Sequence, residues 1–325
     1  MKVAVVGLGA IGGLMAGWLA RHAAPGELTL SAIARGATLQ ALQRDGLLLQ
    51  GSEPVPIYAS DDPAALGPQD LVIVAVKGPA LASVAPAVQA LCDADTPVLV
   101  AMNGVPWWFF QGLGGPCEGL ALQSVDPGGR IAAHIETRRV IGCVVHASST
   151  SPAPGSVRHI GGRGLIIGEP GGGLSGRLSA LAALLTRSGF EVTQSERIQR
   201  DIWFKLWGNM TLNPISALTG ATCDRILDDD LLRGFVSAVM LEAQAIGAAF
   251  GVPIEQRPED RHAVTRKLGA FKTSMLQDAE AGRPLEIDSL VSAVREIGQH
   301  LKLPTPNIDA LLGLVRVMAR QRGLY

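Results

Sequence analysis

The first twenty residues combine a short apolar run with a glycine pattern, and this combination constrains the fold more than any other feature. Residues 2–6 read KVAVV, a β-branched run that ends at a glycine, as a buried parallel strand does. GLGAIG follows at 7–12, and a helical pattern extends from about Ile11 to Arg21. A glycine pattern that directly follows a strand and opens a helix predicts a nucleotide-binding unit.

Each glycine of this pattern has a separate physical task. Gly7 permits the tight turn, Gly9 lets the backbone approach a pyrophosphate, and Gly12 lets the helix pack closely on the strand. The helix N-terminus offers free N–H groups and a positive dipole end to the phosphates. We therefore expect the whole motif to hold a dinucleotide: Gly7, Leu8, Gly9, Ala10, Ile11 and Gly12. The glycines also argue against reading this apolar stretch as a signal peptide or membrane helix.

The rest of the N-terminal half repeats the alternation of strands and helices. Apolar runs at 27–35, 70–77 and 96–104 predict further strands, separated by helical segments. Residues 138–150 and 155–169 resemble two more strands. This order indicates an α/β domain with a doubly wound, Rossmann-type parallel sheet.

A glycine run at 171–173 marks the expected domain boundary. The periodicity beyond it is helical, over 175–188, 197–213, 229–250, 259–281, 286–301 and 306–322. We predict an NADP-binding domain at 1–173 and an all-α domain that carries substrate and catalysis at 174–325.

Composition narrows the function by exclusion. A formal net charge of −1 over 325 residues gives no electrostatic reason to expect nucleic acid or an anionic membrane as a partner. No other apolar run approaches the length that spans a bilayer. The four cysteines form no CxxC pair and the six histidines no ligand spacing, so we expect no metal and free thiols in a reducing compartment, the cytoplasm.

The end of the second strand indicates which dinucleotide binds. An acidic residue there would hold the ribose 2′-hydroxyl of NAD, whereas this strand delivers Arg35. A guanidinium suits a 2′-phosphate, which favours NADP, although a solvated surface arginine is the plain alternative. Lys77 and Asn103 end the third and fourth strands, at the sheet edge where such folds bind ligands. Lys77 could meet a cofactor phosphate or simply face water, and Asn103 could bind nicotinamide or serve as a turn residue before Gly104.

The stretch FKLWGNMTLNPIS at 204–216 places three polar side chains at intervals of four. Lys205, Asn209 and Asn213 then share one helical face and span about 12 Å, while Trp and Leu cover the other faces. Desolvation lowers the pKa of a lysine ammonium, which favours a proton donor in carbonyl reduction. A snorkelling lysine with amides bonded to a neighbouring helix explains the spacing equally well. Pro214 predicts that the helix ends or kinks at Asn213.

Two further residues are candidates for the same site. Ser274 and Glu286 flank the break at Gly282–Pro284, and a plain N-terminal charge on a helix explains Glu286 as well as a functional role does. The aromatic run Trp107–Phe110 is more typical of core or domain-interface packing than of a ligand wall.

These motifs together resemble the ketopantoate reductase (2-dehydropantoate 2-reductase) family over essentially the full length. The resemblance is carried by GLGAIG, Arg35, VKG at 76–78, MNGVPWW at 102–108, PGSVRHIG at 154–161, KLWGNMTLNPISAL at 205–218 and SMLQD…GRPLEID at 274–288. It implies a Rossmann domain joined to a helical domain, with NADPH and ketopantoate meeting in a cleft, and reduction to (R)-pantoate for pantothenate and coenzyme A synthesis.

The resemblance also implies a role for each matching residue. Lys205 would be the general acid, Glu286 would bond the hydroxyl end of the substrate, and Asn103 would position the lysine and the nicotinamide. Asn209, Asn213 and Ser274 would hold the carboxylate side, and Arg35 and Lys77 the adenosine end of NADPH.

Other readings stay open at this point. The same scaffold serves NAD-dependent D-2-hydroxy acid dehydrogenases that act on other branched 2-keto acids, and a non-catalytic NADP-binding sensor would keep the glycines. An imine or opine-type reductase fits less well, because an imine already carries the proton that Lys205 would deliver. The expected partner is a small-molecule 2-keto acid, with a homodimer as the one assembly considered.

Overall fold

The computed structural model describes residues 1–325, which form two compact units. Unit 1 comprises Met1–Met102, Gln111–Leu113 and Gly128–Asp201. Unit 2 comprises Asn103–Phe110, Gly114–Pro127 and Ile202–Tyr325. The chain therefore alternates between the units before it enters the helical C-terminal part.

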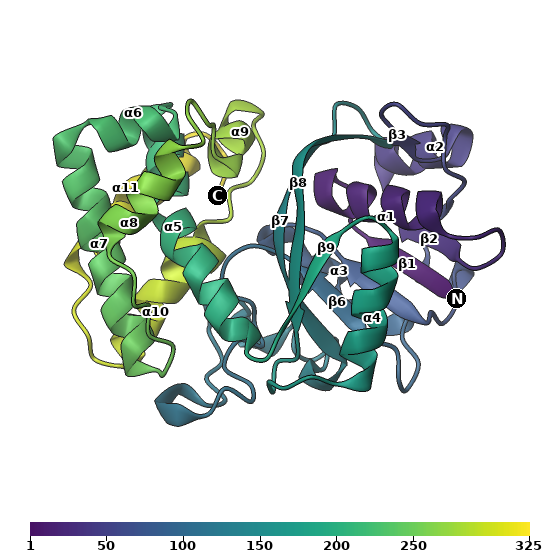
Figure 1. Cartoon of the computed structure of the whole chain (residues 1–325), viewed down its shortest axis with the longest axis horizontal. Helices are drawn as coiled ribbons and strands as arrows, with labels where there is room; N and C mark the ends of the chain where they lie inside the picture. Colours follow the sequence, from purple (N-terminus) through teal and green to yellow (C-terminus); the bar gives the residue numbers. More distant parts are fainter. The chain divides into compact units, whose positions relative to one another are not determined.

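A nine-stranded, mostly parallel sheet forms the centre of unit 1, in the purple to teal part of the chain in Figure 1. The strand order is β3-β8-β7-β6-β5-β1-β2-β4, with β9 added beside β8, and only the β7–β8 pair is antiparallel. The strands are β1 (Lys2–Val6), β2 (Thr29–Ile33), β3 (Leu48–Leu49), β4 (Tyr58–Ser60), β5 (Leu71–Val74), β6 (Val98–Ala101), β7 (Val140–Thr150), β8 (Ser156–Gly168) and β9 (Glu191–Ser195). The doubly wound α/β prediction is confirmed.

Four helices cover this sheet: α1 (Ala10–His22), α2 (Gly36–Asp45), α3 (Gly78–Ala90) and α4 (Gly176–Arg187). The order runs outward from β1 in both directions, to β2 through α1 and to β6 through α3. Right-handed crossovers in opposite directions place α1 and α3 on opposite faces. The division expected at 173 stays a prediction; unit 1 extends past it through α4 and β9.

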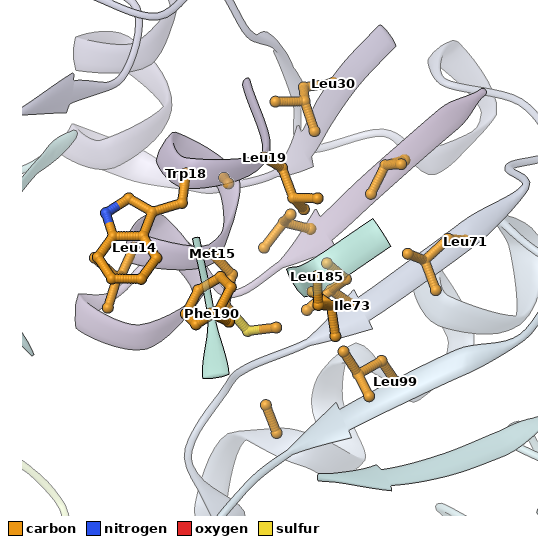
Figure 2. Packing of buried hydrophobic residues seen from close by; sticks show 14 of the residues in the cluster. Leu14, Met15, Trp18, Leu19, Leu30, Leu71, Ile73, Leu99, Leu185 and Phe190 are labelled. Atoms are coloured by element: carbon orange, nitrogen blue, oxygen red, sulfur yellow. The ribbon is translucent and has the colours of Figure 1, made fainter. Parts of the chain in front are cut away.

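The core of unit 1 lies between the sheet and α1 and α4. Leu14, Met15 and Leu19 of α1 pack in one cluster with strand residues such as Ile73 and with Leu185 of α4 (Figure 2). The four β1 residues from Val3 to Val6 are at most 1% exposed, because a parallel sheet covered by helices buries both faces of its central strands. This burial fixes the register of β1 in the sheet, and with it the position of the glycine turn that follows β1.

Unit 2 is built from helices, in the green to yellow part of the chain in Figure 1. Its elements are α5 (Ile198–Thr219, which starts in unit 1), α6 (Cys223–Asp228), α7 (Asp230–Ala249), α8 (Pro258–Arg266), α9 (Ser274–Glu280), a π-helical turn (Asp288–Ser292), α10 (Ala293–His300) and α11 (Pro306–Gln321). The prediction of an all-α C-terminal part is confirmed.

The expected end of α5 at Asn213 is wrong, because the helix continues through Pro214 to Thr219. Proline removes one helical hydrogen bond and crowds the preceding turn. The residues after it are nevertheless buried: Ile215 is 3% exposed and Ser216 is 0% exposed. The burial of this last turn holds the helix together beyond the proline.

The single helix expected over 259–281 is also wrong, because α8 and α9 are separate. Gly269 between them adopts φ +64°, which a helix does not tolerate. Thr273 then caps α9 by accepting a hydrogen bond from the Leu276 N–H at 3.1 Å. The segment expected to begin a helix at 286 starts at Asp288 with the π-helical turn.

Helix α7 is long and apolar enough to cross a membrane by length and composition alone, contrary to the expectation from sequence. Core helices of globular proteins pass the same test. In this fold α7 packs against α6, α8, α10 and α11 through residues such as Val239 and Ile246.

The aromatic run Trp107–Phe110 belongs to the core of unit 2. Phe109 and Phe110 are at most 1% exposed and stack edge to face at 5.0 Å. Both rings meet Phe250, at 5.9 Å and 5.3 Å, and Trp203 of α5 completes the cluster at 4.8 Å from Phe250. Edge-to-face contacts of this kind add to the stability gained from burial. The interpretation as packing rather than a ligand wall fits these contacts.

Candidate functional site

The turn after β1 has the geometry that a dinucleotide requires. Gly7 adopts φ +98°, and a Cβ there would lie 2.6 Å from Val76 Cγ1. A Cβ at Gly12 would overlap the carbonyl oxygen of Gly7. At both positions a Cβ would clash with other atoms of the protein, so this turn requires glycine.

Gly9 differs from Gly7 and Gly12 because nothing lies within 4 Å of the position that a Cβ would occupy. It is the N-cap of α1 and makes no side-chain capping bond, and the first turn of the helix holds no acidic residue. The N–H groups of Ala10 and Ile11 are therefore left for a ligand, beside open space. The observed turn fits the pyrophosphate of a nicotinamide dinucleotide.

Two cations follow other strands of the same sheet. Arg35 comes directly after Ala34 at the end of β2 and is the N-cap of α2. Its side chain is exposed and makes no hydrogen bond or ion pair. Lys77 is the exposed N-cap of α3, after β5. Both positions lie at carboxyl ends of parallel strands, as expected.

In unit 2, the polar face of α5 runs along a helix that is otherwise buried. Trp203 and Trp207 are 1% exposed and Met210 is 0% exposed, and Trp207 Nε1 donates to the Met240 carbonyl at 2.8 Å. Lys205 and Asn209 are half-buried, and Asn213 is 6% exposed. The apolar faces thus fix the rotation of the helix, and with it the direction of the polar side chains.

The Lys205 ammonium is held by Asn103. Nζ donates to Asn103 Oδ1 at 2.8 Å, within unit 2, across 102 positions of sequence. An ammonium has three donors and no acceptor, so it can donate to several oxygens at once. The amide oxygen also fixes the position of the long, flexible side chain. The arrangement can present a proton to a developing alkoxide.

The backbone around Asn103 is tied to the segment that contains Glu286. The Val105 N–H donates to the Ser289 carbonyl at 2.8 Å. Gly104 has φ +81°, and a Cβ there would lie 2.5 Å from the same carbonyl oxygen. Glu286 is 8% exposed and lies just before the π-helical turn, an irregularity that is often found at functional sites.

Not every predicted site residue is brought into this arrangement by a bond. Ser274 is exposed in the first turn of α9, and its hydroxyl makes no hydrogen bond. Asn209 and Asn213 share the face of Lys205, but no hydrogen bond joins their side chains to it. The structure links Lys205 directly to Asn103.

The sequence reading missed Arg261 of α8. Its guanidinium carbon lies 5.3 Å from the centre of the Phe204 ring, and a Cβ at Gly208 would lie 3.0 Å from its Nε. The side chain is half-buried, Nε has no partner, and no carboxylate pairs with it. Burial lowers the pKa of this guanidinium. A lone arginine in a helix carries no sequence signal; only its contact with α5 marks it as a cation able to receive an anionic group.

No three His, Cys, Asp or Glu side chains come together in a way that could hold a metal. All four cysteines are free, and burial raises the pKa of Cys92 and of Cys223 to about 11. Such thiols are protonated at neutral pH and are weak nucleophiles.

The protein combines an open glycine turn on a doubly wound sheet with a lysine on a buried helix whose ammonium is held by an asparagine side chain. These features define the class of dinucleotide-dependent oxidoreductases. The comparisons with known proteins agree. Residues 3–107 match the family model "Ketopantoate reductase PanE/ApbA", and residues 197–319 match "Ketopantoate reductase PanE/ApbA C terminal". The chain belongs to the ketopantoate reductase PanE/ApbA family.

Individual relatives extend over the whole chain. A 2-dehydropantoate 2-reductase from Mesorhizobium japonicum is 45% identical and covers 100% of both chains. A crystal structure of a protein classed as a ketopantoate reductase from Ralstonia solanacearum MolK2 is 59% identical, with a TM-score of 0.95, and covers 100% of this chain and 99% of its own. D-mandelate dehydrogenase, solved with NADH and anilino(oxo)acetate, shares the fold at 20% identity and a TM-score of 0.81, over 99% of this chain and 100% of its own.

Proposed function

We propose that the protein catalyses the NADPH-dependent reduction of 2-dehydropantoate to (R)-pantoate, a step toward pantothenate and coenzyme A. The observation that carries this proposal is the 2.8 Å bond between Lys205 Nζ and Asn103 Oδ1 in a chain of this family. The Mesorhizobium relative, at 45% identity over the full length, supports the substrate.

Within unit 2, the chemistry divides between proton supply and substrate binding. Lys205 donates a proton to the oxygen that forms on C2, and Asn103 keeps the ammonium in place for that transfer. Asn209, Asn213 and Ser274 hold the carboxylate side of the substrate. The Glu286 carboxylate accepts a hydrogen bond from the substrate hydroxyl, an interaction that its low exposure strengthens.

The proton step balances with hydride transfer. The nicotinamide, when bound, supplies hydride to C2. The C2 carbonyl oxygen gains a proton from the Lys205 ammonium, which is left as a neutral amine and regains a proton from water. A fixed cation beside a developing alkoxide is worth most where it is partly removed from water. The half-buried position of Lys205 supports this role.

NADPH is the proposed cofactor because of Arg35. The open turn from Gly7 to Gly12 receives the pyrophosphate through backbone N–H groups. The unpaired guanidinium of Arg35 and the ammonium of Lys77 receive the 2′-phosphate end. A carboxylate in place of Arg35 would favour NADH.

The test of the acid assignment is Lys205→Ala. We expect kcat with 2-dehydropantoate to fall by about 10²–10⁴-fold, the usual contribution of a positioned general acid. The Kd for NADPH should stay unchanged. Lys272→Ala is a matched control in the same unit, since its ammonium pairs with Glu280 at 2.6 Å on the surface. Near-normal turnover in Lys205→Ala would show that another group supplies the proton.

A panel of branched 2-keto acids, each tested with NADPH and with NADH, separates this reaction from that of a D-2-hydroxy acid dehydrogenase. We expect 2-dehydropantoate with NADPH to give the highest kcat/KM. A misfit of one methylene costs about 1–3 kcal/mol, or roughly 10- to 200-fold in kcat/KM. Turnover with none of these acids would favour a non-catalytic NADP-binding sensor.

We also propose a cytoplasmic homodimer. Apolar side chains on two neighbouring helices of unit 2 are exposed: Leu241 of α7 by 55%, and Leu314 and Val317 of α11 by 59% and 60%. Exposed apolar groups on adjoining helices support self-association. Sedimentation equilibrium of the wild type beside Leu314→Glu tests it, with a monomeric wild type as the contrary result.

A further inference from the structure

Unit 1 has a hollow at the far end of α1 that the proposed reaction does not use. Its volume is about 630 Å³, and Trp18, Arg21 and His22 of α1 line it together with residues of β8 and the turn at Gly189. Arg21 lies nine residues beyond Gly12, which is about 14 Å along the helix. The hollow is therefore separate from the glycine turn.

The lining is strongly basic. Arg21, Arg158 and Arg163 all face this hollow, and none of them forms an ion pair. Arg158 makes no side-chain hydrogen bond, and Arg21 only donates to Ser52 Oγ at 3.3 Å. Three positive charges in one concavity of a chain with net charge −1 are a concentration that folding alone does not require.

Aromatic contacts form the floor of the hollow. The Trp18 ring lies 4.5 Å from Phe190 and 5.0 Å from the His159 ring, and Figure 2 shows Trp18 beside Phe190 at the border of the core. The Arg163 guanidinium sits 5.9 Å from the centre of the same Trp18 ring. His159 Nε2 donates to the Gly162 carbonyl at 2.6 Å. The Arg163 guanidinium thus lies over the Trp18 ring before any ligand arrives.

The lining identifies the kind of ligand. The volume lies within the usual range of small-molecule sites, about 300–1,000 Å³. Unpaired guanidinium groups suit phosphate oxygens, which they can bind with two parallel hydrogen bonds. A smaller hollow shares Arg21 and Leu49 with this one, and its Glu53 is the one acidic residue among the lining residues of the two.

We propose that this hollow is an accessory binding site for a small, multiply charged phosphate compound. Arg158 and Arg163 of β8 hold the phosphate oxygens from one side, and Arg21 of α1 holds them from the other. The site lies wholly within unit 1 and is independent of the cofactor site, so both can be occupied together.

Trp18 provides a direct probe of this site. It is the one tryptophan of unit 1, since the other four, at 107, 108, 203 and 207, belong to unit 2. Protein labelled with 5-fluorotryptophan therefore gives one ¹⁹F resonance from the hollow, which Trp18→Phe assigns. Pyrophosphate is titrated at constant ionic strength with saturating NADPH, so that the glycine turn is already filled.

We expect a saturable shift of the Trp18 resonance, with an affinity that rises from phosphate to pyrophosphate to tripolyphosphate. Arg158→Gln with Arg163→Gln should weaken binding by at least about tenfold. Arg44→Gln is the matched control, an exposed arginine of unit 1 that pairs with Asp45 at 2.6 Å, and should change nothing.

Three results would overturn the proposal. They are a Trp18 shift that NaCl reproduces at equal ionic strength, a shift that survives in the Arg158/Arg163 variant, and a response to heparin without one to pyrophosphate. The last would indicate a surface for a macromolecular polyanion. The thermal unfolding midpoint of each variant shows that unit 1 is intact. Arg158 has no partner to lose and Arg163 loses only its exposed contact with the Trp18 ring, so we expect the midpoint of the double variant to change little.

Discussion

Gly9→Ala separates cofactor binding from folding within a single motif. The added methyl group meets no heavy atom within 4 Å, and the backbone at φ −80°, ψ −155° is open to alanine. The loss of glycine at the N-cap costs a fraction of a kcal/mol, and the smaller entropy of the unfolded chain offsets a similar amount. We expect the free energy of unfolding to change by less than about 1 kcal/mol.

The effect on NADPH binding should be much larger. The methyl group projects into the open space at the N-terminus of α1, where the pyrophosphate would approach the N–H groups of Ala10 and Ile11. Loss of one hydrogen bond to a charged oxygen costs about 1.5–3 kcal/mol. At 1.4 kcal/mol for each factor of ten, the Kd for NADPH should rise by about 10- to 150-fold.

The assay compares calorimetric titration of NADPH with urea unfolding for three variants. Gly17→Ala is the control on the same helix, since its Cβ makes only an ordinary 3.4 Å contact with Leu49, and it should bind NADPH normally. Gly7→Ala should lose stability first, because its Cβ would lie 2.6 Å from Val76 Cγ1 at φ +98°. A Gly9→Ala variant that binds NADPH as tightly as the wild type would refute this account of the turn.

Three further outcomes follow from single contacts. Glu169→Gln should destabilise unit 1 by about 1–3 kcal/mol and make stability fall less steeply in acid. Burial raises the pKa of Glu169, but hydrogen bonds from Arg177, at 2.5 Å, and from Ser175 outweigh burial, so the folded-state pKa is lowered. The stabilisation from Glu169 is therefore present above the unfolded-state pKa and is lost as pH falls through the folded-state pKa. Gly104→Ala should lower the free energy of unfolding by at least about 2 kcal/mol and lower kcat, because the left-handed backbone and the contact with the carbonyl of residue 289 both oppose a Cβ. Gly114→Ala is the control, since Gly114 has φ +75° and no neighbouring atom, so its change in stability measures the cost of the backbone conformation alone. Arg261→Met should raise KM for the keto acid about tenfold without lowering Tm, because an unpaired half-buried cation destabilises the fold. A lower Tm with unchanged KM would show that the guanidinium only packs on the Phe204 ring.

The long, regular parts of the fold could be predicted from sequence because local patterns determine them. Residues 2–6 form β1 as expected, and the glycine motif opens α1. The short strands gave no such signal. β9 has the sequence EVTQS and is mostly exposed, so no apolar run marks it; it is held by pairing with β8. Pro214 misled the reading for the opposite reason, because tertiary burial outweighs a strong local preference.

In the candidate site too, local sequence patterns determine some features and tertiary contacts determine the others. Spacing on one helix predicted that Lys205, Asn209 and Asn213 share a face, and that much follows from geometry. The bond from Lys205 to Asn103 joins residues 102 positions apart and depends on how the chain returns to unit 2. Spacing and periodicity do not distinguish this partner from a turn asparagine before glycine; only the resemblance to the reductase family, through MNGVPWW at 102–108, pointed to it. Arg261 and the basic hollow escaped notice for the same reason, since each depends on contacts between distant segments.

The path of the chain explains how the proposed proton donor, Lys205, is held in place. Asn103–Phe110 follows β6 of unit 1 in sequence but belongs to unit 2, so Lys205 and the amide that orients it lie in one compact body. Gly104 and the bond from Val105 to Ser289 fix this short segment to the turn after Glu286. The groups that we propose to bind phosphate, from Gly7 to Lys77, lie in the other unit. We therefore expect substitutions around Asn103 to change kcat through the lysine, while the Kd for NADPH, which we attribute to the phosphate-binding groups proposed in unit 1, stays near its normal value.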